Sequence, residues 1–116
     1  MITQPIRQQN GTATPQRLRA LTQLYEQGYQ DQVVDLTVHK LLEQQVQKEE
    51  AQLAALAAEL ANYETRFGMS STHFFAKYTA GEMGDDADVF EWQALYKMQQ
   101  RLANERQFLK AQLVPA

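Results

Sequence analysis

Apolar residues recur along residues 42–67 at alternating intervals of four and three positions. The series is Leu42, Val46, Glu49, Leu53, Leu56, Leu60, Tyr63 and Phe67, and only Glu49 breaks its apolar character. A 4-3 spacing places every member on one side of an α-helix and is the heptad pattern of helices that pack against one another. No glycine or proline occurs between Gly28 and Gly68, so the pattern predicts one long helix over about residues 31–67.

A second series with the same spacing lies near the other end of the chain. Its members are Trp92, Leu95, Gln99, Leu102, Arg106, Leu109 and Leu113. No glycine or proline occurs between Gly84 and Pro115, so the pattern predicts a helix from about Asp86 to Leu113.

Two long helices joined by a compact connection are expected to fold back on each other in antiparallel orientation. The expected neighbours are Trp92 with Tyr63, Leu102 with Leu53, and Leu113 with Leu42. The predicted fold class is therefore all-α, a long antiparallel helix hairpin that resembles a coiled coil.

A short helix is predicted at the N-terminal side of the hairpin. Thr14 and Pro15 are typical of a helix start, and they predict a helix from Pro15 to about Gln27 after a flexible polar leader over residues 1–14. Residues 15–114 then form a single helical domain. The helix carries the apolar stripe Leu18, Leu21, Leu24 and Tyr25, which is expected to cover the apolar patch Val34, Val38, Leu41 and Leu42.

The connection between the two long helices is predicted to contain another short helix. Gly68 is expected to end the first long helix in a left-handed conformation. Ser70 or Ser71 then caps a helix that runs to about Thr79 and carries Phe74, Phe75 and Tyr78. Residues 80–85 are expected to form a turn.

Composition narrows the class of protein. The chain has 116 residues, which favours one domain. It contains no cysteine, so disulfides and thiolate chemistry are excluded. No apolar run approaches the length of a membrane span, and the N-terminal residues lack the apolar stretch of a signal peptide. A cytoplasmic location is the expectation.

Charge is distributed unevenly. Residues 1–25 contain Arg7, Arg17 and Arg19 and no acidic residue, whereas residues 81–92, GEMGDDADVFEW, contain five acidic residues and no basic one. The net charge of −3 and the small number of arginines argue against nucleic acid as the main partner. A DNA-binding autoregulator that uses the basic arm stays an alternative.

Seven of the eleven aromatic residues lie between Phe67 and Tyr96. One interpretation is a small core that holds the corner between the long helices. The other is an interface, because aromatic rings with an acidic rim are typical of binding hot spots. Asp85 or Asp86 is expected to cap the last helix, with Asp88 in its first turn, which explains much of the acidic cluster.

No enzyme or metal site is predicted. The two histidines, His39 and His73, have no ligand triad around them. DDADVFE lacks the ligand pattern of a calcium loop, and neither a nucleophile–base pair nor a phosphate loop is present. We therefore expect no catalysis, metal or cofactor.

The apolar stripe of the first long helix is longer than one hairpin partner needs. In AQLAALAAELA, residues 51–61, alanines lie beside the leucine series and would allow another helix to approach closely. A homodimer or a partner helix is therefore expected.

Residues 67–98, FGMSSTHFFAKYTAGEMGDDADVFEWQALYKM, resemble a segment of a family of small helical prokaryotic proteins. The family pattern is roughly G-M-S-S, a short aromatic helix, and then A-G-E-L-G-D-D-x-D-x-F-E-W before a closing helix. LYEQGYQDQVVDLTVHKLLEQQ is similar to the N-terminal half of these proteins, so the resemblance spans about residues 17–113. Met83 stands where leucine is more usual. Members of the family often lie beside a toxin-like gene, which implies an antitoxin or partner-binding role.

The functional hypothesis is a protein-binding module, an antitoxin that neutralises a toxin encoded by an adjacent gene. The alternatives are a homodimeric coiled-coil scaffold without a toxin and the DNA-binding autoregulator. The expected partner-binding residues are Phe74, Tyr78, Glu82, Asp85, Asp86, Asp88, Phe90 and Trp92.

Overall fold

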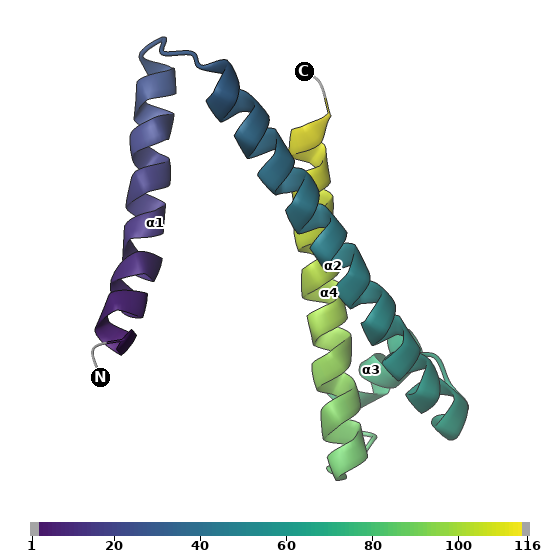
Figure 1. Ribbon diagram of the computed structural model, residues 1–116. Helices are drawn as coiled ribbons and strands as arrows, with labels where there is room; N and C mark the ends of the chain where they lie inside the picture. Colours follow the sequence, from purple (N-terminus) through teal and green to yellow (C-terminus); the bar gives the residue numbers. More distant parts are fainter. Residues whose placement is uncertain (1–2, 115–116) are drawn as a thin grey trace. The chain divides into compact units, whose positions relative to one another are not determined.

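The structure is a computed structural model that describes residues 3–114, with side chains described from Ala13 onward. It contains four helices, α1 (Thr3–Glu26), α2 (Gln32–Phe67), α3 (Ser71–Thr79) and α4 (Ala87–Leu113), and no strand within the described residues (Figure 1). The all-α prediction is confirmed. The chain divides into two compact units, Met1–Thr37 and Val38–Ala116, and each is described by itself.

The second unit is the predicted antiparallel hairpin. Residues 38–67 of α2 lie along α4, and α3 lies near the corner that joins them (Figure 1). Tyr63 stacks on Trp92 at one end, and the Glu50 carboxylate lies 3.9 Å from Arg106 further along. The two pairs share one antiparallel register, and the same register predicts that Leu53 lies opposite Leu102. The predicted packing of α2 on α4 and the pairing of Tyr63 with Trp92 are therefore confirmed, whereas the pairings of Leu53 with Leu102 and of Leu42 with Leu113 stay predictions.

The predicted seam is buried where the two helices meet. The buried apolar residues along it are Val46, Leu56, Leu60, Tyr63, Trp92 and Leu102. Glu49 interrupts the apolar series but does not face solvent, since only 3% of it is exposed. The heptad spacing thus determines which side of α2 is buried even at a charged position.

The helix boundaries follow from local chemistry at most of the predicted positions. The Asp31 carboxylate accepts hydrogen bonds from the backbone N–H groups of Val33 and Val34 at 2.8 and 3.2 Å, so it caps α2. Gly68 has a φ of +67°, the left-handed conformation expected after a helix end. The Ser70 hydroxyl accepts from the His73 N–H at 3.1 Å and caps α3.

The structure confirms the position of the predicted N-cap of α4 but not its capping hydrogen bond. Asp86 occupies the N-cap position, but its side chain makes no capping hydrogen bond. Its backbone is extended at ψ 155°, and its carbonyl accepts from the Phe90 N–H at 3.0 Å. The acidic side chains near this helix start therefore act through the helix dipole rather than through a capping hydrogen bond.

The first helix differs from its prediction. α1 begins at Thr3 and runs through Pro15, so the predicted start at Pro15 is wrong. Proline already has the helical φ, although it removes one backbone hydrogen bond and crowds the preceding turn. Arg7 and the glutamines that precede Pro15 are good helix formers. Of the predicted flexible leader, residues 1–2 lie outside the described residues, and its flexibility stays a prediction.

Within the first unit, α1 does not cover the start of α2. Leu21 and Leu24 of α1 are exposed, and so are Val33 and Leu36 of α2. The contact that forms instead is polar, because the Tyr25 hydroxyl donates to the Asp35 carboxylate at 2.6 Å. Of the predicted patch, only Val34 belongs to this unit, and it is half-buried. The cover of Val38, Leu41 and Leu42 by α1 stays a prediction. No helix in the described part of the chain is long and apolar enough to span a membrane.

Candidate partner-binding surface

The corner between α2 and α4 is built around Trp92. The indole ring stacks on Phe74 with a centroid distance of 3.8 Å and an interplanar angle of 5°. Tyr63 stacks at 5.6 Å, and the indole N–H donates to the Ser71 hydroxyl at 2.9 Å. The polar edge of the ring is therefore satisfied inside the core. Neither Trp92 nor Phe74 has any exposed surface.

This burial removes two residues from the predicted partner-binding set. Phe74 and Trp92 hold the corner together, and a partner has no access to them in the folded chain. Tyr78 is half-buried against Phe74 and Phe75. Of the two interpretations of the aromatic cluster, the structural core accounts for most of the rings.

One ring of the cluster faces outward. Phe90 lies in the first turn of α4 and is 66% exposed, whereas its neighbour Val89 is only 3% exposed. Glu82, Asp85 and Asp86 are also exposed, in the segment that leads into α4. We define the corner surface as these four residues, Glu82, Asp85, Asp86 and Phe90.

The backbone of the connecting segment is held from the α3 side. The Gly81 N–H donates to the Tyr78 carbonyl at 3.0 Å, and the Glu82 N–H donates to the Lys77 carbonyl at 2.9 Å. Met83 packs against the aromatic core. The acidic side chains therefore stand on a segment whose first residues are anchored to α3 and to the aromatic core.

Asp88 belongs to a different contact from the other acids. Its carboxylate accepts from the Arg66 guanidinium at 2.6 Å, and this ion pair links α2 to α4. Arg66 also lies 5.4 and 5.6 Å from the ring centroids of Tyr63 and Phe67. An exposed pair of this kind contributes about 0–1 kcal/mol. The sequence-based prediction missed Arg66, although the antiparallel register that pairs Tyr63 with Trp92 also brings Arg66 to Asp88.

Tyr63 makes a second link between α2 and α4, because its hydroxyl donates to the Glu91 carboxylate. That hydrogen bond is the largest cause that raises the pKa of Tyr63 to about 12, and burial and the negative charges of Glu91 and Asp88 act in the same direction. The ordinary tyrosine value is 10.0. The folded state therefore holds the phenolic proton more tightly than the unfolded chain does.

This difference predicts a pH dependence of stability. Because the folded pKa is raised, the contribution of Tyr63 is fully present below pH 10 and is lost as pH rises toward 12. Chemical denaturation of the wild type and of Tyr63→Phe should give a stability difference that shrinks across this window. Other tyrosines and lysines also titrate in this pH window, but both proteins contain them, so their contributions cancel in the stability difference. A stability difference that stays constant across the window would contradict the prediction.

The histidines do not form a metal site with other side chains. His39 lies 3.3 Å from Glu43 on the same face of α2, and His73 lies in the first turn of α3. Among the described residues, no group of three or more His, Cys, Asp or Glu side chains could hold a metal ion.

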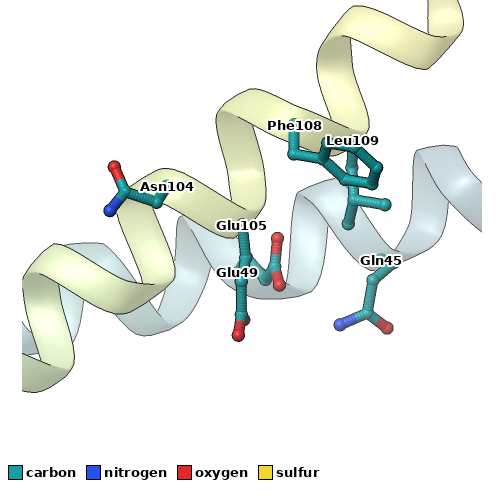
Figure 2. Close-up of a pocket in the computed structure, with 6 residues that line it drawn as sticks. All are labelled: Gln45, Glu49, Asn104, Glu105, Phe108 and Leu109. Carbon is teal, nitrogen blue, oxygen red and sulfur yellow. The ribbon is translucent and has the colours of Figure 1, made fainter.

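A groove between α2 and α4 is a second candidate surface, which the sequence-based analysis missed. It is lined by Gln45, Glu49, Asn104, Glu105, Phe108 and Leu109 (Figure 2). Its lining is mostly apolar, and Phe108 is 65% exposed at its edge. Phe108 is not a member of the heptad series, so the periodicity pointed to no role for it.

Comparison of the chain with protein-family models, with curated proteins and with solved structures finds no match in any of the three.

Proposed function

We propose that this chain is a protein-binding module and that the corner surface docks the partner. The observation that carries the proposal is the exposure of Phe90, 66% of which faces solvent beside three exposed acids. An aromatic side chain with a charged rim has the composition of an interface hot spot. The buried stack of Phe74 and Trp92 holds the frame beneath it, so little ordering is needed on binding.

The charge and exposed ring of the corner surface predict what kind of surface the partner presents. Glu82, Asp85 and Asp86 present carboxylates that have no basic neighbour within residues 81–92. The partner is therefore expected to offer an apolar pocket for Phe90 with lysines or arginines around it. Complementary charge of this kind mainly speeds association.

In its finer form the proposal is an antitoxin, which binds and neutralises a toxin encoded by an adjacent gene. The support is that residues 81–92 both carry the family resemblance and supply the corner surface. The homodimeric scaffold is the alternative function, and the exposed leucines of α1 favour it. Co-expression with the product of the adjacent gene tests the choice, because a scaffold without a toxin would purify alone.

We expect Phe90→Ser to weaken binding of that gene product at least ten-fold, which corresponds to about 1.4 kcal/mol. The matched control is Phe108→Ser, because Phe108 lies on the same helix and is 65% exposed. Calorimetric titration of both variants measures the effect. Equal affinities for the two variants would remove the corner surface from the interface.

We expect a double charge reversal, Glu82→Lys with Asp85→Lys, to slow association and to leave the helical signal unchanged. Asp88 is omitted because its reversal would also break the ion pair with Arg66. Association rates at several salt concentrations provide the measurement, since the wild-type rate should fall with salt and the rate of the variant should not. A lowered melting temperature would show instead that these acids are structural.

A further inference from the structure

The groove between α2 and α4 contains a buried carboxylate without a partner. Glu49 is 3% exposed, and its Oε1 accepts no hydrogen bond. Glu105 of α4 lines the same groove (Figure 2), and its carboxylate lies 3.9 Å from the exposed Arg101. A buried polar atom that lacks a hydrogen bond destabilises the folded chain, because the atom has lost its bonds to water without replacing them. The groove therefore favours a ligand that brings a positive charge.

The cations of the second unit do not neutralise Glu49. The antiparallel register places Arg106 opposite Glu49, yet Arg106 lies 3.9 Å from Glu50, and Lys110 lies 3.8 Å from the same carboxylate. The Nε of Arg106 is itself buried without a partner. Among the described side chains, no lysine, arginine or histidine lies within 4.0 Å of the Glu49 carboxylate.

Helix α1 of the same chain carries positive charge and exposed apolar residues. Between Ala13 and its last residue, α1 has two arginines, and its one acid is the terminal Glu26. Arg17, Leu21 and Leu24 follow one another at intervals of four and three residues, so they lie on one side of the helix. Both leucines are exposed. This side of α1 therefore joins a positive charge to an uncovered apolar stripe.

We propose that the groove of one copy binds α1 of a second copy. Leu21 and Leu24 pack against Phe108 and Leu109, and Arg17 reaches the exposed carboxylate of Glu105, which lines the same groove as the buried Glu49. The occupant is α1 because its charge and apolar surface complement those of the groove, and the mass of the assembly in solution distinguishes a second copy from the same chain. It is independent of the corner surface and of the proposed function.

A reciprocal exchange between two copies would close the assembly. If the groove of each copy takes α1 of the other, the two contacts are equivalent by two-fold symmetry, and the assembly stops at a dimer. Each copy then covers the leucines of α1 and the ring of Phe108, which together form the kind of exposed apolar surface that marks an interface.

Light scattering and sedimentation of the full chain over a range of concentrations test the proposal. We expect a concentration-dependent dimer whose dissociation constant rises at least ten-fold in Phe108→Ser and stays unchanged in Phe90→Ser. A wild type with the mass of one chain at every concentration would overturn the proposal. Equal effects of the two phenylalanine variants would overturn it as well, and circular dichroism confirms that each variant is folded.

A charge swap identifies the helix that occupies the groove. Arg17→Glu and Glu105→Arg are each expected to weaken the dimer, and the double variant is expected to recover the affinity lost by the single ones. Additive losses in the double variant would show that Arg17 and Glu105 do not meet, which would exclude α1 of a second copy as the occupant. Because none of these substitutions touches the corner surface, binding of the gene product is a separate readout.

Discussion

Trp92→Ala is expected to lower the free energy of unfolding by about 3–5 kcal/mol, as the deletion of a fully buried ring does. The ring has no exposed surface and stacks on both Phe74 and Tyr63. Its removal also leaves the buried Ser71 hydroxyl without its donor. A small domain has only about 5–15 kcal/mol of stability in total, so the variant is expected to be close to unfolding at ambient temperature.

Denaturant titration followed by circular dichroism measures this loss, because the variant has no tryptophan left for fluorescence. Phe90→Ala is the control, since it removes a ring from the same helix at a position that is 66% exposed. Its effect is expected to stay within about 0.5 kcal/mol. Similar losses in the two variants would mean that Trp92 is not the centre of the corner core.

Glu49→Leu is expected to act in the opposite direction and to raise the free energy of unfolding by about 1–3 kcal/mol. The substitution removes a buried oxygen without a partner and places an apolar side chain at a seam position between two helices. The measurement is best made in the Phe108→Ser background, so that self-association does not contribute to the apparent stability.

Glu59→Leu is the matched control for this gain, because Glu59 lies on the same helix and is exposed. Its effect is expected to be within about 0.5 kcal/mol. A Glu49→Leu variant less stable than the wild type would show that the carboxylate is stabilised inside the groove, with Arg106 as the nearest candidate on the opposing helix.

The two candidate surfaces place similar phenylalanines at opposite ends of α4. Phe90 and Phe108 have nearly equal exposure, 66% and 65%, yet one stands beside acids on the corner and the other at a groove. Each therefore controls for the other in every experiment on binding. The proposed function and the proposed dimer can fail independently.

The sequence by itself determined the hairpin of the second unit and its register. Heptad spacing and the absence of glycine and proline are local properties, and they sufficed to predict α2, α4 and the pairing of Tyr63 with Trp92. Local chemistry also predicted the start of α2 near Asp31, the cap at Ser70 and the stop at Gly68, because each depends on a few consecutive residues. Pro15 misled the prediction because a proline compatible with the helical φ does not have to mark a helix start.

Only the tertiary structure decided which aromatic and acidic residues are accessible. Phe74, Phe90 and Trp92 all belong to one aromatic-rich stretch. The apolar series placed Trp92 opposite Tyr63, but no pattern distinguished Phe74 from Phe90. Packing buries two and exposes the third, because burial depends on which side of a helix faces a distant segment rather than on residue type. For the same reason, Asp88 pairs with Arg66 while Glu82 and Asp85 stay exposed. The groove at Glu49 needed two helices in register before it existed, so no local pattern could predict it.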